Sequence, residues 1–177
     1  MLGAVPAFIA YPNDKVEPSK YRSGVGGVTA NLNARLVVVD EEFPDEMLSY
    51  VALGEEARLL RAEDGRGSGG EEKVPHSTDH PHGDHGNSVA FIQHSAGTTG
   101  LQKGVALTHA AVLRQLEHLA QALEIDRAAD RIYSWLPLYH DMGLIACFML
   151  PMVCHMPVVM QSPLEWVMHP EIGRAHV

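Results

Sequence analysis

A ten-residue segment at positions 95–104, with the sequence SAGTTGLQKG, carries the residue types that bind phosphate. Its glycines let backbone N–H groups approach an anion closely, its hydroxyl groups add hydrogen-bond donors, and Lys103 adds a mobile positive charge. The segment is not a Walker A loop, because two residues separate Gly97 from Gly100 and Lys103 is followed by Gly104. An ordinary surface turn needs neither the lysine nor so many hydroxyl groups. The segment therefore predicts a phosphate-binding loop.

The sequence on either side of this loop predicts the elements that position it. Residues 88–93 and 105–107 are short apolar runs with strand-forming side chains, so the loop is expected to join two strands. Thr108 stands where it can cap a following helix. The apolar residues of that helix recur at helical spacing and predict one buried face. They are Val112, Leu113, Leu116, Leu119, Ala120 and Leu123.

A second segment that contains a residue able to do chemistry lies at positions 135–143, with the sequence WLPLYHDMG. It contains His140, whose imidazole can donate, accept or transfer a proton near neutral pH. Taken alone, a histidine beside a tyrosine is more often a structural residue than a catalytic one. From these residues alone, a structural role for His140 is therefore favoured.

The two segments, in this order, resemble those of the AMP-forming acyl-adenylating enzymes. This superfamily includes acyl-CoA synthetases, fatty-acyl-AMP ligases, luciferases and the adenylation domains of peptide synthetases. The loop is similar to the family's phosphate-binding signature, from which it departs at Ala96, where serine is usual, and at Gln102, where proline is usual. The resemblance implies that the ATP phosphates are held by Ser95, Ala96, Gly97, Thr98, Thr99, Gly100, Lys103 and Gly104.

The sequence of the second segment is most similar to the corresponding segment of fatty-acyl-AMP ligases and related acyl-CoA ligases. In that family the segment lines the acyl pocket. The resemblance implies that His140 is the catalytic candidate near the reacting carboxylate and that Tyr139 and Gly143 are its neighbours in the acyl site.

The activity implied by this resemblance is the ATP-dependent activation of a carboxylic acid, a fatty acid or a similar compound, as an acyl-adenylate. The acyl group would then pass to coenzyme A or to a carrier-protein thiol. Mg²⁺ would accompany ATP, and the resemblance places its carboxylate ligand outside this chain. Two alternatives stay open, a nucleotide-binding module without chemistry and an inactive structural remnant. The chain by itself is expected to be inactive.

The resemblance also implies an α/β fold, part of the large N-terminal domain of such an enzyme, with mostly parallel sheets flanked by helices and truncated at both ends. Residues 1–62 and 88–170 are expected to belong to this domain, and the valine-rich run at 36–40 predicts one of its parallel strands. Residues 63–87, rich in acidic, glycine and histidine residues, predict a flexible loop. Residues 171–177 resemble a translated sequencing adapter and are expected to be a non-native tail.

The histidines of this loop suggest a metal site at first sight. They are His76, His80, His82 and His85. Transition-metal ligands need a packed scaffold that fixes their geometry, and the surrounding residues offer almost no apolar side chains. The absence of a fixed metal site is therefore the favoured interpretation, and a weak surface affinity for zinc or nickel stays open as the alternative.

Charge and apolar content narrow the possible partners and compartments. The net charge of −9, from 22 acidic and 13 basic residues, argues against nucleic acid as a partner. Cys147 and Cys154 are expected to be free thiols, which suits a reducing cytosol.

Prolines interrupt the apolar run at 144–160, which predicts a buried helix and a buried strand at 158–160 rather than a membrane span. Its methionines, Met149, Met152 and Met156, are expected to fill the core.

Overall fold

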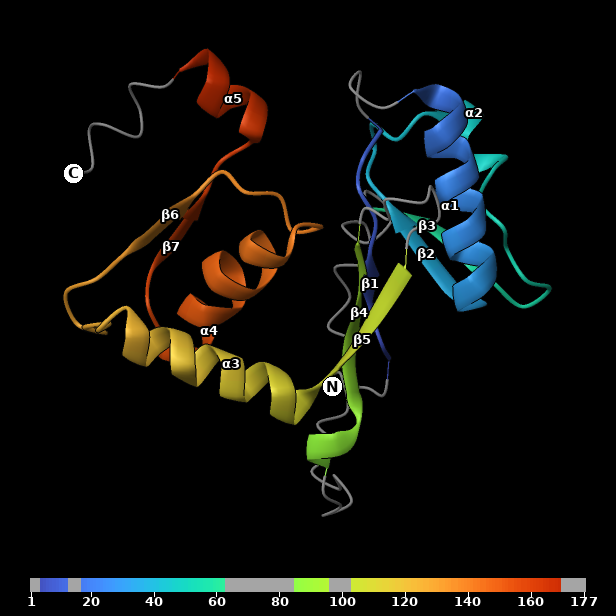
Figure 1. Cartoon of the computed structure of the whole chain (residues 1–177). Helices are drawn as coiled ribbons and strands as arrows, with labels where there is room; N and C mark the ends of the chain where they lie inside the picture. The colour runs from blue at the N-terminus through green and yellow to red at the C-terminus, as the bar shows by residue number, and fades with distance from the viewer. Residues whose placement is uncertain (1–3, 13–16, 63–84, 96–102, 170–177) are drawn as a thin grey trace, which may run out of the picture. The chain divides into compact units, whose positions relative to one another are not determined.

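The computed structural model describes residues 4–12, 17–62, 85–95 and 103–169, and these form an α/β fold (Figure 1). The chain divides into two compact units. The first contains residues 4–8, 85–94 and 105–169, and the second contains 9–12, 17–62, 95 and 103–104. Each unit is described by itself. The proposed tail at 171–177 and most of the histidine-rich loop lie outside the described residues.

One sheet has the strand order β1 (Ala7–Phe8), β4 (Val89–Ser95) and β5 (Lys103–Thr108), and all of it except Ser95, Lys103 and Gly104 belongs to the first unit. β1 runs parallel to β4, with Ala7 beside Ile92 and Phe8 beside Gln93. The short 3₁₀ turn η2 (His85–Asn87) precedes β4. The two predicted strands on either side of the phosphate loop are therefore confirmed, and they are neighbours in one sheet.

The predicted helix follows as α3 (His109–Ala122). Thr108 caps it as expected, since the Thr108 hydroxyl accepts a hydrogen bond from the Ala111 N–H at 3.2 Å. Val112 and Leu116 are buried, but Leu113 and Leu123 are 55% and 60% exposed, so the predicted apolar face was too wide. Leu113 borders an open hollow rather than the core, and Leu123 lies past the last helical residue.

The rest of the first unit consists of β6 (Ile132–Ser134), the π-helical segment η3 (Met142–Met149), α4 (Leu150–Cys154), β7 (Val158–Met160) and α5 (Pro163–Met168). β6 and β7 form a parallel pair. The predicted helix and strand at 144–160 are thus present. The strand is not buried, however, because Val159 and Met160 are 56% and 39% exposed. A two-stranded sheet leaves these side chains without a covering layer among the described residues.

The core of the first unit gathers apolar side chains from β4, α3, η3, α4 and the segment between α4 and β7. Its buried members are Ala90, Phe91, Val112, Leu116, Leu144, Leu150, Cys154 and Met156. Met149 packs against this cluster, whereas Met152 is 57% exposed, so the expected core role is wrong for Met152. Cys147 and Cys154 are free thiols, as predicted.

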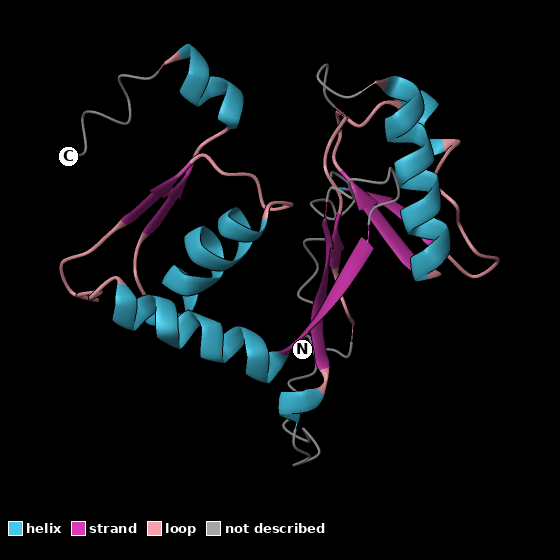
Figure 2. Ribbon diagram, in the orientation of Figure 1, coloured by secondary structure: helices cyan, strands magenta, loops and turns pink. Residues whose placement is uncertain are grey.

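The second unit contains α1 (Pro18–Leu32), β2 (Leu36–Val39), α2 (Asp45–Leu48) and β3 (Arg58–Arg61). α1 begins with proline at its first position and ends at Asn33, whose left-handed backbone is a common helix stop. β2 and β3 pair in parallel, which confirms the predicted parallel strand at 36–40. The strand pairs of both units are the magenta arrows in Figure 2.

Two polar side chains connect the elements of the second unit. The buried hydroxyl of Thr29 on α1 accepts a hydrogen bond from the Ala52 N–H at 2.9 Å and donates one to the Val25 carbonyl at 2.7 Å. Arg61, at the end of β3, donates to the carbonyls of Glu41 and Phe43, each at 3.2 Å, and pairs with the Asp45 carboxylate. These bonds fix α1 and β3 to the segments beside them.

Candidate active site

The predicted phosphate loop is described only at its two ends. Ser95 is the last residue of β4, and Lys103 and Gly104 are the first residues of β5, where both are exposed. Ala96, Gly97, Thr98, Thr99 and Gly100 lie outside the described residues. The structure therefore confirms that neighbouring strands flank the segment, and the phosphate contacts stay a prediction.

The predicted acyl-site residues lie close together in the chain of the first unit, Tyr139 and His140 between β6 and η3 and Gly143 in the first turn of η3. His140 is held by its backbone on both sides. Its N–H donates to the Pro137 carbonyl at 3.0 Å, and its own carbonyl accepts from the Leu144 N–H at 2.9 Å. The first bond closes a tight turn and the second starts the helical segment, so the position of His140 is set by the entry into η3.

The side chain of His140 is exposed and faces its neighbour Asp141. Its Nδ1 lies 2.7 Å from Asp141 Oδ1, and the exposed fractions of the two side chains are 55% and 71%. The Met142 N–H lies 2.8 Å from the same carboxylate oxygen and 3.2 Å from His140 Nδ1. Tyr139 is 37% exposed. The imidazole is thus anchored at Nδ1, and about half of the side chain stays open to solvent.

Gly143 is required by the close approach of two backbone segments. A Cβ atom added at this position would lie 2.3 Å from the Pro137 carbonyl oxygen and 2.9 Å from that of Leu136. Because real Cβ contacts are never that short, only glycine lets η3 begin so close to residues 136–137. The same Pro137 carbonyl accepts the hydrogen bond of His140, so Gly143 supports the turn that carries the histidine.

Two further features beside the motifs were not predicted. The chain's two tryptophans, Trp135 and Trp166, stack with ring centroids 4.7 Å apart and planes at 19°, which attaches α5 to the start of the acyl-site segment. His94 precedes the phosphate loop, and both its ring nitrogens are buried without a hydrogen-bond partner among the described residues. Burial lowers the pKa of His94. Neither feature has a signature in local sequence, because each depends on packing.

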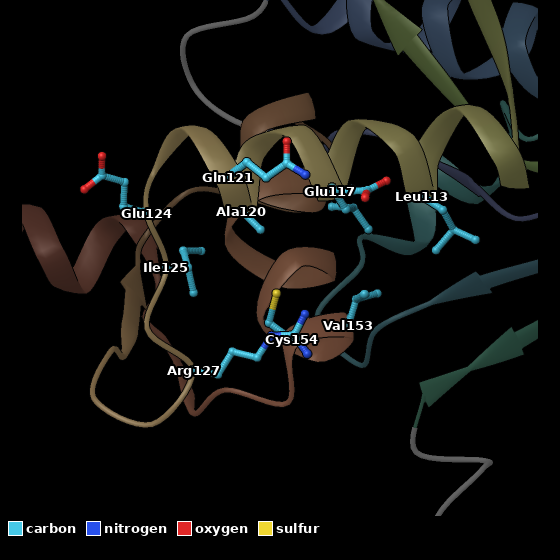
Figure 3. A pocket seen from close by; sticks show the side chains of 10 residues that line it. Leu113, Glu117, Ala120, Gln121, Glu124, Ile125, Arg127, Val153 and Cys154 are labelled. Carbon is cyan, nitrogen blue, oxygen red and sulfur yellow. The ribbon is translucent and has the colours of Figure 1, made fainter.

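A hollow of about 570 Å³ lies beside α3 and α4, apart from the acyl-site residues (Figure 3). Its lining mixes apolar and charged side chains, among them Leu113, Val153, Cys154, Glu117 and Arg127. Tyr139, His140 and Gly143 do not line it. We therefore assign it no part in the candidate active site.

The described residues contain no cluster of three or more metal-ligating His, Cys, Asp or Glu side chains. His76, His80 and His82 fall in the part of the chain that the structure does not describe, and the absence of a metal site in their loop stays a prediction. Among the helices that are described, none combines the length and the apolar character that a membrane crossing requires.

The described residues combine parallel strand pairs with two neighbouring strands that flank a glycine-rich segment, and His140 stands at the entry of η3. The comparison with protein families identifies the class of protein. The AMP-binding enzyme family matches residues 4–171, and the chain belongs to this family.

Two curated relatives share part of the sequence. The chain is 37% identical over 84 residues to the long-chain-fatty-acid–AMP ligase FadD32 of Mycolicibacterium smegmatis. It is 31% identical over 84 residues to the medium-chain-fatty-acid–[acyl-carrier-protein] ligase TtuA of Teredinibacter turnerae. Each match covers 48% of this chain and 13% of the relative, so the chain spans a small part of the proteins that it matches.

Solved structures share the fold. A fatty acyl-adenylate ligase from L. pneumophila, in complex with acyl adenylate and pyrophosphate, superimposes with a TM-score of 0.71 at 23% identity. The match covers 98% of this chain and 28% of that protein. The predicted α/β fold and the resemblance to acyl-adenylating enzymes are both confirmed.

Proposed function

We propose that this chain is the phosphate-loop and acyl-site part of an ATP-dependent ligase that activates a carboxylic acid as an acyl-adenylate. The observation that carries the proposal is the match to the AMP-binding enzyme family, because it extends over both motif segments. The exposed imidazole of His140, fixed at the entry of η3, supports it.

The proposed chemistry needs a cradle for the phosphates and an ordered carboxylate. Residues 95–100, Lys103 and Gly104 would hold the β- and γ-phosphates and stabilise the charge that develops on the leaving pyrophosphate. His140, with Tyr139 and Gly143 beside it, would shape the carboxylate end of the acyl site. We propose that Mg²⁺ accompanies ATP and neutralises phosphate charge, and we assign it no ligand in this chain.

For the substrate we propose a fatty acid, and for the acceptor coenzyme A or a carrier-protein thiol. The support comes from the relatives, one of which acts on long-chain fatty acids and another of which is a ligase to acyl-carrier protein. The free thiols of Cys147 and Cys154 support a reducing compartment, and we propose the cytosol.

The test is pyrophosphate exchange in the protein encoded by the complete reading frame. We expect labelled pyrophosphate to enter ATP only when a fatty acid is present, and a panel of chain lengths would define the substrate. Lys103→Ala should lower the exchange rate, since the lysine stabilises pyrophosphate, while Arg127→Ala removes a positive charge outside both motifs and should not. A folded protein that binds ATP but gives no exchange with any acid would favour the non-catalytic module.

A further inference from the structure

The hydrogen bonds around His140 determine which of its ring nitrogens carries the proton. Nδ1 lies 2.7 Å from Asp141 Oδ1, the distance of a charge-assisted hydrogen bond. Two lone pairs would repel each other at this distance, so Nδ1 must be protonated and must donate. The Met142 N–H cannot then donate to Nδ1 as well, and it donates instead to Asp141 Oδ1, which is nearer at 2.8 Å.

A single carboxylate oxygen therefore accepts two hydrogen bonds, one from the histidine ring and one from the first turn of η3. The second of these is a helix cap, because Asp141 precedes the first residue of the segment. The capping bond limits the motion of the carboxylate, and the turn to Pro137 limits the motion of the histidine backbone. The ring is thus held at Nδ1 and its backbone at the turn, by residues that all lie within four positions of His140.

We propose that Asp141 is a positioning residue that holds His140 with the proton on Nδ1 and leaves Nε2 as the nitrogen that meets the ligand. The role of Nε2 toward the carboxylate rests on the proposed function. In the protonated ring Nε2–H donates to an anionic oxygen while Nδ1–H stays bound to Asp141. The negative charge of the Asp141 carboxylate offsets the positive charge of the ring. A carboxylate that orients a histidine in this way is a common arrangement in enzymes.

The test reads the tautomer directly, by long-range ¹H–¹⁵N correlation of ¹⁵N-histidine-labelled protein at about pH 8, above the ordinary histidine pKa. The chain has 11 histidines, and His140→Gln identifies the signal of interest by its disappearance. We expect the wild-type ring to show a protonated Nδ1 and an unprotonated Nε2. The opposite pattern in wild type would by itself overturn the proposal.

Two substitutions separate the tautomer from the helix cap. Asp141→Asn keeps an oxygen that can accept from both donors and should preserve the wild-type pattern. Asp141→Ser keeps a capping oxygen for the Met142 N–H but is too short to hold the ring, so the pattern should move toward the tautomer protonated at Nε2. A wild-type pattern in Asp141→Ser would show that the carboxylate does not set the tautomer.

The exchange assay in the complete protein adds a functional reading. We expect Asp141→Ser to lower fatty-acid-dependent exchange by about tenfold or more. Asp141→Asn keeps the accepting oxygen but not the negative charge, and it should recover only part of the exchange. If the tautomer is as proposed and wild type shows no exchange, the proposed function fails and the role of Asp141 stands. If exchange occurs and both variants match wild type, the proposed function stands and the role of Asp141 fails.

Discussion

At the scale of single residues, position 143 requires glycine because there is no room for a Cβ atom, not because the backbone needs the freedom of glycine. We expect Gly143→Ala to lower the free energy of unfolding by about 1–3 kcal/mol, because its methyl group would overlap the Pro137 and Leu136 carbonyls. Urea denaturation would measure the change. The matched control is Gly27→Ala in α1, where an added Cβ meets nothing within 4 Å and should stabilise the helix by about 0.5–1 kcal/mol. Equal stability of Gly143→Ala and wild type would contradict the close approach.

His94 gives the molecule a pH dependence of known sign. Burial lowers its pKa in the folded chain, while the unfolded chain titrates near the ordinary value of about 6.5. Between the two values the unfolded chain binds more protons. The stabilisation is therefore complete above the unfolded pKa and is lost as the pH falls toward the folded one.

We expect His94→Phe to make the free energy of unfolding less sensitive to acid, since phenylalanine fills the same space without a basic nitrogen. The measurement is denaturant unfolding of both proteins at about pH 8 and about pH 5. Wild type should lose more stability between these conditions than the variant. Identical losses would show that His94 is not a source of the acid sensitivity.

At the scale of elements, the hydroxyl of Thr29 connects α1 to the segment after α2. Thr29 is 2% exposed, and it is the hydrogen-bond acceptor for the Ala52 N–H. Thr29→Val keeps the shape of the side chain but leaves that N–H without its partner, which should cost about 1–3 kcal/mol. Thr29→Ser keeps the hydroxyl and should cost less. Hydrogen exchange at the Ala52 amide should speed up in Thr29→Val alone, and unchanged protection there would contradict the bond.

The elements that the sequence could predict are those that depend on nearby residues. β4, β5 and the Thr108 cap follow from short apolar runs and from one hydroxyl in the right place. The exposure of Leu113 and Val159 could not be predicted, because it depends on which elements cover them. The stacking of Trp135 on Trp166 joins positions far apart in the sequence, so spacing alone gave no sign of it.

The candidate site also combines features that nearby residues determine with features that depend on packing. Its residues could be proposed from motif order and composition, since glycines, hydroxyl groups and a lysine together suit phosphate. The sequence pattern does not reveal why position 143 must be glycine or that His140 contacts Asp141. Both depend on distances between atoms in the folded chain. The residues of the candidate site could therefore be proposed from the sequence, whereas the contacts that support His140 and Gly143 could not.

At the scale of the whole molecule, the parallel strand pairs carry apolar side chains that nothing covers among the described residues. On β2 and β3 these are Leu36, Val38 and Leu60, with exposed fractions of 51%, 62% and 42%. Val38 pairs with Leu60, and Leu36 lies two residues from Val38, so the three share one face. Parallel sheets are usually covered on both faces, and this pair is covered on one.

An uncovered apolar face makes the isolated chain prone to association. We expect it to bind the dye ANS and to sediment as species larger than a monomer. Val38→Lys should reduce both effects with little loss of stability, because the side chain already faces solvent. Val39→Lys is the matched control, since Val39 is 9% exposed on the opposite face and its replacement by a charge should unfold the second unit. A wild-type chain that stays monomeric and does not enhance ANS fluorescence would contradict the exposure of this face in solution.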